Sequence, residues 1–487
     1  MKPSNARLLP SLVLPLVLPL VFAAAASAAT RYVNANLTTG TGDGTSWENA
    51  YRGPQGLYQA MAASVSGDQI WVAAGTYKAS TSSRTVSHVI KAGVATYGGF
   101  AGGETSLDQR DLDVNLCVVS GDLLGNDTSA ASTRTDNSYH VLTATTGTTG
   151  VFDGFEVRAG YANSSANNDR GAGIICLASQ SPTIRNCRFF DNRCTFGGGA
   201  GYVNGSAPKF IACDFEANQG GTYGGAFDCA GAGQVTFQDC IFVDNLAARA
   251  GALEFFQSQP RVTNCLFVGN RATGSGGGGA IWLGSSAAAV IRNVTVVGNF
   301  ATVTSAGIYN TGGSSSVANS IVWGNTGPGT TADNGVRSVG GTTSVTYSCV
   351  QGITSGTGNI GVDPQMANPS AGDFRLQLNS PCVDVGSNAQ VPAGVTVDLD
   401  GNSRIVEIPG VGGGTPKAPV VDMGAYETQL PPPACPADFD DDGTVGPADL
   451  AALLGAWGTS ACDLDGDGVT GPGDLASLLG SWGPCPG

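Results

Sequence analysis

The sequence is short of basic residues, of histidine and of the cysteine spacings that bind metals. It holds 23 Lys and Arg against 38 Asp and Glu, which gives a formal net charge of −15. Nucleic acids and anionic membranes need a basic surface, so this balance argues against both as partners. No Cys-x-x-Cys occurs, and His88 and His140 are the only histidines. The usual ligand spacing of a Cys/His zinc site is therefore missing.

Long apolar runs are confined to the N-terminus. A positively charged start and the apolar residues 8–22 precede an Ala-Ser-Ala triplet at 26–28. This order is typical of a signal peptide, here residues 1–28, and a membrane anchor is the alternative. Three prolines and the short apolar length disfavour the anchor. We expect an exported protein, secreted or at the cell surface, without a transmembrane segment after signal removal.

One heptapeptide phrase recurs along the middle of the chain, as NCRFFDN, ACDFEAN, DCIFVDN, NCLFVGN, NVTVVGN and NSIVWGN. Its closing Asn falls at 192, 218, 245, 270, 299 and 325, so the unit is about 26 residues long. A second phrase, GGA or AGA, lies between the copies. This unit is too short for a pair of helices and fits one coil of a parallel β-helix with three short strands.

Stacked coils place equivalent residues above one another about 4.8 Å apart. We therefore expect three ladders, made of Cys187, Cys213, Cys240 and Cys265, of Phe189, Phe215, Phe242 and Phe267, and of the six asparagines. The cysteines are interpreted as small buried hydrophobes rather than as redox groups. The asparagine amides are predicted to hydrogen-bond from coil to coil. The glycines suit corners that need positive φ or close backbone approach.

The Phe-x-x-Asn and Gly-Gly-Ala pairing over residues 151–326 resembles that of chlamydial polymorphic outer-membrane proteins, which are β-helical adhesins. GTSWENAYRGPQGLYQAMAAS near the start, and PCVDVG, DLDGNSRIV and VDMGAYE near the end, resemble exported bacterial β-helix proteins common in Planctomycetes-like bacteria. That resemblance covers about residues 31–428. It implies a right-handed parallel β-helix of the pectin-lyase-like kind. Val296 and Val322 depart from the phenylalanine pattern.

The expected organisation has five parts. They are a signal peptide at 1–28, an N-terminal cap at 29–64, the β-helix at 65–427 with a closing segment at 373–427, a Pro-rich linker at 428–434 and a small module at 435–487. Within the cap, Gln55–Ala63 is predicted to form an amphipathic helix that covers the first coil, because an open sheet edge invites aggregation. The closing segment is expected to cover the other end of the β-helix, over the last coil.

The module contains two twelve-residue aspartate loops, DFDDDGTVGPAD and DLDGDGVTGPGD. A hard dication takes oxygen ligands from positions 1, 3, 5, 7 and 12 of such an EF-hand-like loop, with Gly at position 6. The predicted ligands of the first loop are Asp438, Asp440, Asp442, the Thr444 carbonyl and Asp449. Those of the second loop are Asp463, Asp465, Asp467, the Val469 carbonyl and Asp474. The sequence thus predicts two Ca²⁺ ions.

Each loop leads into a short helix with an apolar face, and the two faces are expected to pack together. The predicted apolar residues are Leu450, Leu453, Leu454 and Trp457 in one helix, and Leu475, Leu478, Leu479 and Trp482 in the other. The pair of units resembles a type I dockerin, which implies docking to a cohesin-like or other cell-surface partner. Pro447-Ala448 and Pro472-Gly473 replace the hydroxyl residues that dockerins usually present there, so cohesin binding does not carry over safely. One disulfide is expected among Cys435, Cys462 and Cys485, with Cys435–Cys485 favoured.

Catalytic residues are not evident in the repeats, because no cluster of three carboxylates falls on matching positions. The best candidates, Arg188, Asp214 and Glu254, are interpreted as surface ion-pair partners. VDLDGNSR, with Asp398 and Asp400, is interpreted as a tight turn rather than a cation site. The sequence therefore favours a non-catalytic binding, adhesion or matrix protein, with a polysaccharide as a possible ligand. The alternative is a polysaccharide lyase or glycoside hydrolase on the same scaffold.

Overall fold

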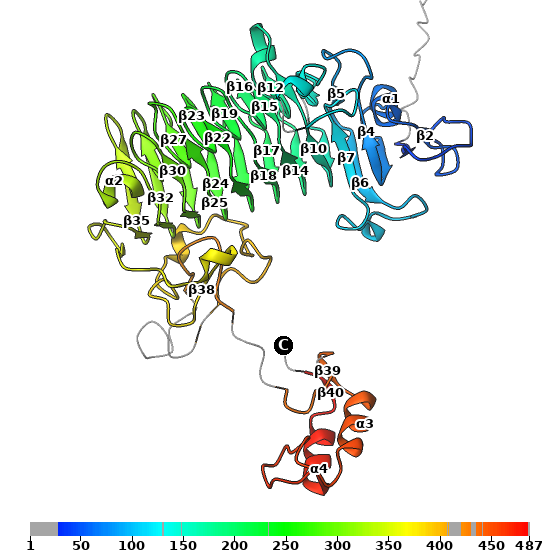
Figure 1. Cartoon of the computed structure of the whole chain (residues 1–487), viewed down its shortest axis with the longest axis vertical. Coiled ribbons are helices and arrows are strands. Elements are labelled where there is room, and N and C mark those ends of the chain that lie inside the picture. Colours follow the sequence, from blue (N-terminus) through cyan, green and yellow to red (C-terminus); the bar gives the residue numbers. More distant parts are fainter. Residues whose placement is uncertain are drawn as a thin grey trace, which may run out of the picture.

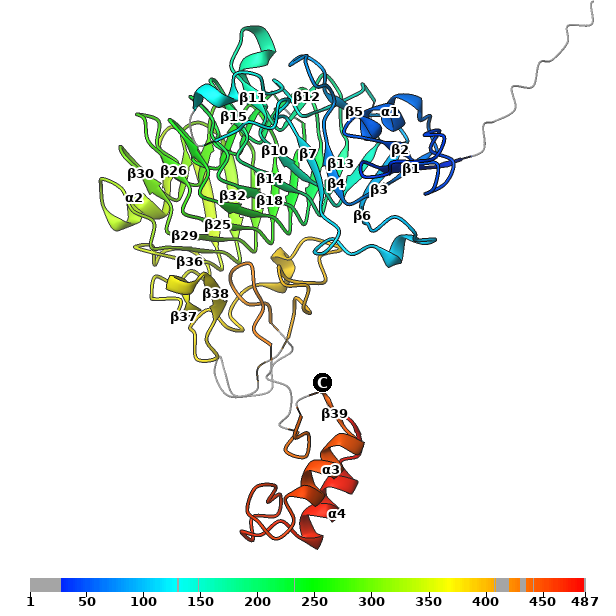
Figure 2. The same ribbon diagram turned by 45° about the vertical axis from the view of Figure 1, so that its right-hand side comes forward.

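The computed structural model describes residues 28–128, 131–147, 149–231, 233–406, 408, 420–429, 435–440 and 442–485. Its main part is a stack of coils in which the chain passes through three parallel sheets in turn (Figure 1). One coil runs through β12 (Ile174–Leu177), β13 (Thr183–Arg185), β14 (Arg188–Phe190) and β15 (Arg193–Cys194). The next coil repeats this path in register 26 or 27 residues later. Figure 2 shows the stack with α1 and β1 at one end and β36 at the other.

The three long sheets contain one strand from nearly every coil. The twelve-stranded sheet has the order β2 (Tyr51–Arg52), β1 (Thr30–Asn34), β3 (Gln69–Ala73), β6 (Ala95–Phe100), β9 (Val151–Asp153), β13, β17 (Lys209–Ile211), β20 (Thr236–Gln238), β24 (Arg261–Thr263), β28 (Val290–Arg292), β32 (Ser314–Ala318) and β35 (Thr342–Thr346). The ten-stranded sheet has the order β36 (Cys349–Val350), β33 (Ile321–Trp323), β29 (Thr295–Val297), β25 (Leu266–Val268), β21 (Ile241–Val243), β18 (Asp214–Glu216), β14, β10 (Glu156–Arg158), β7 (Cys117–Ser120) and β4 (Gly75–Tyr77). The nine-stranded sheet has the order β34 (Val336–Ser338), β31 (Ile308–Asn310), β27 (Ile281–Leu283), β23 (Leu253–Phe256), β19 (Phe227–Ala230), β16 (Gly201–Asn204), β12, β8 (Leu142–Ala144) and β5 (His88–Ile90).

Smaller elements complete the fold. The short sheets are β11 (Tyr161–Ala162) with β15, and β22 (Leu246–Ala247) with β26 (Arg271–Ala272) and β30 (Phe300–Ala301), together with the pairs β37 (Met366–Asn368) with β38 (Asp373–Leu376) and β39 (Thr444–Val445) with β40 (Gly483–Pro484). The α-helices are α1 (Gly56–Ala63), α2 (Thr331–Gly335), α3 (Pro447–Gly455) and α4 (Pro472–Gly480). The 3₁₀ helices are Leu107–Gln109, Ala131–Arg134, Ala166–Asp169, Pro369–Ala371 and Asn388–Gln390.

The repeated heptapeptide forms a strand between two corners. Asn186 and Asp191 bracket β14 with φ angles of 49° and 50°. Asn and Asp tolerate this left-handed conformation better than most residues, which explains their place in the phrase. Between the corners Phe189 points inward and is fully buried, while Arg188 and Phe190 alternate to the outside.

The asparagines form one continuous chain of amides. Each Nδ2 donates to Oδ1 of the asparagine in the next coil, over distances of 2.8 to 3.1 Å. The backbone N–H of each asparagine donates to the same oxygen. All of these side chains are buried, where an amide without partners would be costly. The predicted asparagine ladder is confirmed.

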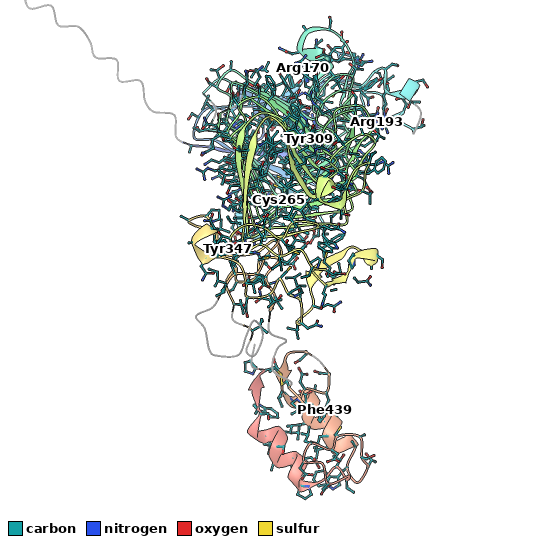
Figure 3. The ribbon with its side chains drawn as sticks, turned by 90° about the vertical axis from the view of Figure 1, so that its left-hand side faces the viewer. Arg170, Arg193, Cys265, Tyr309, Tyr347 and Phe439 are labelled. Atoms are coloured by element: carbon teal, nitrogen blue, oxygen red, sulfur yellow. A yellow bond between two sulfur atoms is a disulfide. The ribbon has the colours of Figure 1, made fainter. Side chains whose placement is uncertain are left out.

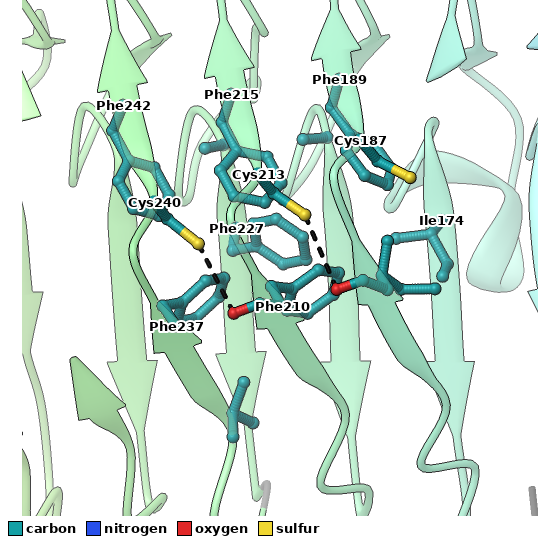
Figure 4. Close-up of a cluster of buried hydrophobic side chains, with 14 of the residues drawn as sticks. Ile174, Cys187, Phe189, Phe210, Cys213, Phe215, Phe227, Phe237, Cys240 and Phe242 are labelled. Atoms are coloured by element: carbon teal, nitrogen blue, oxygen red, sulfur yellow. Dashed lines mark hydrogen bonds between the residues drawn. The ribbon is translucent and has the colours of Figure 1, made fainter. Parts of the chain in front are cut away.

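The phenylalanine ladder forms the centre of the core. Phe242 stacks on Phe215 with ring centroids 4.8 Å apart (Figure 4). On its other side Phe242 stacks on Phe267 at 4.6 Å. A second column, with Phe210 and Phe237 centroids 5.1 Å apart, packs against the first. Each coil buries its rings against the coils beside it, as expected for a repeat that cannot form a core alone.

The cysteine ladder lies beside these rings. Cys213 and Cys240 donate to the carbonyls of Ile184 and Phe210 at 3.6 and 3.5 Å, shown as dashed lines in Figure 4. The ladder cysteines are buried and reduced. Burial raises the pKa of the Cys187, Cys213 and Cys240 thiols well above their ordinary value, which suppresses the reactive thiolate. Their role as small buried hydrophobes is confirmed.

The GGA phrase forms the corner that leads into the nine-stranded sheet. Gly198 has a φ of 72°, and a Cβ on Gly199 would lie 2.6 Å from the backbone nitrogen of Gln219. The corner uses one glycine for positive φ and the next for close backbone approach. Just before it, a Cβ on Gly197 would lie 2.3 Å from an oxygen of Asp228, so this glycine lets the chain fold over a side chain of the sheet.

The predicted N-terminal helix is present as α1. It buries Leu57, Ala60 and Met61, the residues assigned to its apolar face, and contacts β1, β2 and β5. These three residues join the main core. The cap also extends the sheet itself, because β1 and β2 pair in parallel and β1 continues to β3.

The closing segment lies differently from the expectation that it covers the last coil. Met366, Phe374, Cys382 and Met423 pack against the outward residues of β25, β29, β33 and β36. The Ala425 N–H donates to Thr295 Oγ1 at 3.0 Å. The segment therefore covers one half of the outer face of the ten-stranded sheet, because that half carries apolar residues that water would otherwise reach.

Candidate functional sites

The C-terminal unit has its own small core. Ala437, Val445, Leu453, Cys462 and Leu478 are buried, and Phe439 packs against them (Figure 3). β39 pairs with β40 in antiparallel fashion, and a disulfide joins Cys435 to Cys485 with their Cα atoms 5.8 Å apart. The favoured cysteine pairing is thus the one in the structure. The disulfide and the strand pair bring the two ends of the unit together.

The first aspartate loop brings three of its predicted ligands together. One oxygen from each of Asp438, Asp440 and Asp449 lies within 4.8 Å of the others. Asp449 lies in the first turn of α3, and its oxygens accept from the N–H groups of Phe439 at 2.6 Å and Gly446 at 2.8 Å. Asp449 therefore anchors the loop to the start of the helix.

The second loop repeats this arrangement. Asp463, Asp465 and Asp474 again offer oxygens within 4.8 Å of one another. Asp474 accepts from the N–H groups of Leu464 at 2.5 Å and Gly471 at 2.6 Å. Two loops 25 residues apart along the chain thus adopt one geometry, which a merely acidic tail would not do.

The remaining predicted ligands lie outside these close groups. Asp442 accepts from the Thr444 N–H at 2.8 Å, and Asp467 accepts from the Val469 N–H at 2.9 Å, as in ordinary Asx turns. Their side chains and the carbonyls of Thr444 and Val469 stay predicted ligands.

Backbone hydrogen bonds set the charge of the innermost aspartates. The N–H of Gly446 lowers the pKa of Asp449, and the N–H of Gly471 lowers the pKa of Asp474. Hydrogen bonds to a carboxylate favour its ionised form. Each loop therefore holds a fixed negative charge at its centre, which is the chemistry that a hard cation requires.

The helix faces pack only in part as expected. Leu453 and Leu478 are fully buried, and Leu450 and Leu475 are half-buried against the same core. The other four predicted apolar positions are exposed, namely Leu454, Trp457, Leu479 and Trp482. The prediction was wrong for these four because two short helices cross over too small an area to cover them.

The outer face of the ten-stranded sheet carries an ion-pair network on its other half. Arg188 donates to Glu156 at 2.7 Å and to Glu216 at 2.6 Å, while Asp214 is its register partner in β18. Arg158 also contacts Glu156 at 3.2 Å. Arg188 is thus an ion-pair partner, as interpreted from the sequence, and its partners are the two glutamates that the sequence did not indicate. Asp214 forms no ion pair within the described residues, so the interpretation was wrong for its side chain.

Glu254 lies on the nine-stranded sheet, away from Arg188, and it is a buried partner of Arg249 rather than the surface ion-pair partner expected from the sequence. Asp228 is its register partner in the adjacent coil, and both side chains are buried, with exposed fractions of 4% and 2%. Arg249 donates to Glu254 at 3.1 Å and stacks on Trp282, 3.9 Å from the ring centroid. Burial and the Glu254 charge raise the pKa of Asp228 to about 8.

The Asp228 and Glu254 pair could have been found in the sequence. Both acids stand two residues after the last Ala of a GGA or AGA phrase, at 226 and 252. Comparing coils on this second phrase, rather than on the asparagine phrase alone, aligns them.

The VDLDGNSR segment forms the tight turn that the sequence favoured. Asp398 Oδ1 accepts from the N–H groups of Asp400 at 3.0 Å and Asn402 at 2.8 Å. Its other oxygen accepts from the Glu427 N–H at 2.9 Å. The carboxylate of Asp398 is thus fully engaged in holding the chain.

Among the comparisons with known proteins, a family model agrees with the coil architecture. Residues 132–301 match the family model of a right handed beta helix region. The metabotropic glutamate receptor-like protein P of Dictyostelium discoideum is 29% identical over 103 residues, which are 21% of this chain and 7% of that protein. The structure of pectate lyase Pel9A aligns with 15% identity and a TM-score of 0.41 over 83% of this chain and 97% of that one. The match to the family model confirms the predicted right-handed β-helix.

Within the described part of the chain, no helix combines the length and apolar character needed to cross a bilayer. The predicted signal peptide lies outside the described residues except for Ala28, as does most of the Pro-rich linker.

Proposed function

We propose that this is an exported, non-catalytic binding or adhesion protein that a calcium-dependent C-terminal unit attaches to a partner. The observation that carries the proposal is the duplicated aspartate geometry of the two loops. The leader sequence at 1–28 supports export to the cell surface or medium.

Two Ca²⁺ ions would be held by the aspartates already close together, joined by Asp442, Asp467 and the Thr444 and Val469 carbonyls. Residues 435–487 contain nine aspartates and no Lys or Arg, so the carboxylates repel one another. Bound calcium offsets this repulsion, which couples the folding of the unit to the metal.

The exposed side chains of the two helices supply a surface for attachment. Leu454 lies within α3 and Trp457 just after it, and Leu479 and Trp482 occupy the equivalent positions within and after α4; each of the four is about half exposed. Clustered exposed apolar residues mark interaction sites. The proposed partner is a cohesin-like or other cell-surface protein.

The coil stack is the proposed ligand-binding part, with a polysaccharide as its ligand. Its surface carboxylates Glu156 and Glu216 are paired with Arg188 and so are not free to act as nucleophile or base. This pairing supports binding rather than catalysis.

Calcium titration of the full-length mature protein tests the attachment unit. Adding Ca²⁺ should raise the unfolding temperature of the C-terminal unit, and equilibrium dialysis should find two bound ions. D438A with D463A should abolish both effects, whereas E48A, which removes an exposed carboxylate of the cap, should retain them. A flat response of the wild-type protein overturns the calcium proposal.

A carbohydrate-active enzyme is the second candidate, and one observation favours it. Asp228 and Glu254 form a carboxyl pair whose pKa values are both raised by burial, and glycosidases use a pair of carboxyl groups as acid and nucleophile. Their burial beneath the corner argues against this role. Incubation with neutral and acidic polysaccharides decides the matter, because new reducing or unsaturated ends would establish the enzyme and their absence would leave the binding protein.

A further inference from the structure

A pocket lies near the N-terminal end of the stack, on the outer face of the ten-stranded sheet. It has a volume of about 220 Å³ and is lined by Thr76, Lys78, Ser120, Asp122, Asp127 and Arg158, among others. The strands β4, β7 and β10 run side by side here, with Tyr77, Val119 and Val157 in register and fully buried. The residues next to them in each strand therefore face outward, into the pocket.

The loop that forms the pocket wall is held in place by its own side chains. Asp122 accepts from the N–H groups of Gly125 at 2.6 Å, Asn126 at 3.2 Å and Asp127 at 3.1 Å. Asn137 donates to Asp127 at 2.8 Å and to the Ala159 carbonyl at 2.7 Å. The wall is thus fixed before any ligand binds, which lowers the entropic cost of binding.

Two cations face the pocket with hydrogen-bonding capacity to spare. Lys78 Nζ donates to the Leu123 carbonyl at 3.2 Å, and within the described residues it has no carboxylate in ion-pair range. An ammonium has three donors, so others remain free. Arg158 uses one nitrogen on Glu156 at 3.2 Å, and its side chain is 46% exposed.

The acids of the pocket are already engaged. Asp122 holds the loop, and one oxygen of Asp127 accepts from Asn137 while the other is buried without a hydrogen-bond partner. The Arg134 guanidinium lies 3.7 Å from the Asp127 carboxylate, and its positive charge offsets the repulsion of an anion by Asp127. The hydroxyls of Thr76 and Ser120 and the side chain of Val118 complete a lining of donors beside an apolar patch.

We propose that this pocket binds one anionic sugar unit of a glycan, with the negative group between Lys78 and Arg158 and the ring hydroxyls against Thr76 and Ser120. Charge-assisted bonds from Lys and Arg suit a carboxylate, a phosphate or a sulfate ester. The volume is below the roughly 300 Å³ at which pockets for larger ligands begin, so it takes one ring. The inference rests on the proposed role of the stack as the ligand-binding part.

Saturation-transfer NMR on the full-length mature protein tests the pocket. The probes are D-glucuronate and D-glucose 6-phosphate, which separate the two kinds of anion, with D-glucose and inorganic phosphate as partial ligands. At least one anionic sugar should bind at least about tenfold more tightly than either partial ligand, because each partial ligand lacks either the charged hydrogen bonds or the ring contacts.

Variants place the binding in the pocket. K78M and R158M should each weaken binding about tenfold or more, while K78R should retain most of it. K209M is the matched control, because Lys209 is an exposed lysine at the start of β17 in another sheet. If either K78M or R158M fails to fold, the remaining variant and K78R test the pocket.

Three results overturn the proposal. They are the absence of binding by both anionic sugars, equal binding of inorganic phosphate or glucose, and unchanged binding by K78M and R158M. Calcium titration of the same samples separates the two proposals. A normal calcium response without sugar binding removes the pocket alone, whereas sugar binding without a calcium response removes only the attachment unit.

Discussion

The coil stack and the C-terminal unit hold short elements together in opposite ways. In the stack, every coil from 187 to 325 places an asparagine and an apolar residue against their counterparts in the next coil. The C-terminal unit buries a handful of apolar residues and carries aspartates without a compensating Lys or Arg. It closes through the Cys435–Cys485 disulfide. The stack obtains cohesion from repetition, whereas the small unit depends on a covalent bond and, by our proposal, on ions.

Breaking the disulfide should have the largest effect on stability, and this effect should be confined to the C-terminal unit. The bond closes a loop of 50 residues, and its loss should destabilise the C-terminal unit by about 4 kcal/mol. The other cysteines are reduced, so a reductant or C435S with C485S should leave the stack unchanged. Calorimetry with and without reductant measures both transitions. A shift of the stack transition by the same amount would show that the regions are not independent.

Cutting the asparagine ladder is the reverse experiment. In N245A the N–H groups of Asn218 lose their acceptor inside the core, and the Phe215 carbonyl loses a donor. We expect a loss of about 3 kcal/mol from the stack, because each unpaired buried polar group costs about 1–3 kcal/mol. Urea unfolding followed by tryptophan fluorescence measures it.

N167A is the control for the ladder experiment, since Asn167 is exposed. It should change stability by less than about 0.5 kcal/mol. An N245A protein as stable as N167A would mean that the ladder is incidental to the cohesion of the coils.

A change of pH should have the smallest effect on stability. It acts within the stack, on the buried carboxyl group of Asp228. The folded-state pKa of Asp228 is about 8, above its ordinary value of 3.8, so the folded protein binds this proton more tightly than the unfolded chain. The stabilisation that this bound proton gives the folded protein is fully present below about pH 4. It is lost as the pH rises towards 8. Glu254, Arg170 and Arg249 face the same group.

D228N removes this titration. Relative to wild type, the variant should gain stability between pH 5 and pH 9, by at least on the order of 1 kcal/mol. Urea unfolding at both pH values measures the gain. Parallel curves for the two proteins would mean that Asp228 does not hold a proton in the folded state.

The features that repeat were predictable from the sequence. The coil, the ladders of Asn, Phe and Cys, and the inward face of α1 follow from spacing, because register in a stack fixes which residues meet. The tight turn at Asp398 and the favoured disulfide are also as expected. The aspartate loops lie where the pattern puts them, with three acids of each brought together.

The features that do not repeat were less predictable. The place of the closing segment depends on which half of a sheet face is apolar. It therefore depends on contacts between residues far apart in the chain, such as Ala425 and Thr295. The Asp228 and Glu254 pair is not evident from the asparagine spacing, because Asp228 follows Asn218 by ten residues and Glu254 follows Asn245 by nine. The exposure of Trp457 and Trp482 follows from the area that two short helices can share, which periodicity does not report.

The ladder of amides allows the length of the coil stack to change by whole coils. Every asparagine presents the same donor and acceptor to its neighbours, so one coil is interchangeable with the next at that seam. Adding or deleting a whole coil in register would preserve the asparagine hydrogen bonds between coils. It would change the length of the stack by about 4.8 Å. Duplicating one 26-residue segment would therefore lengthen the stack between its first coil and its last coil. No other change to the core would be needed.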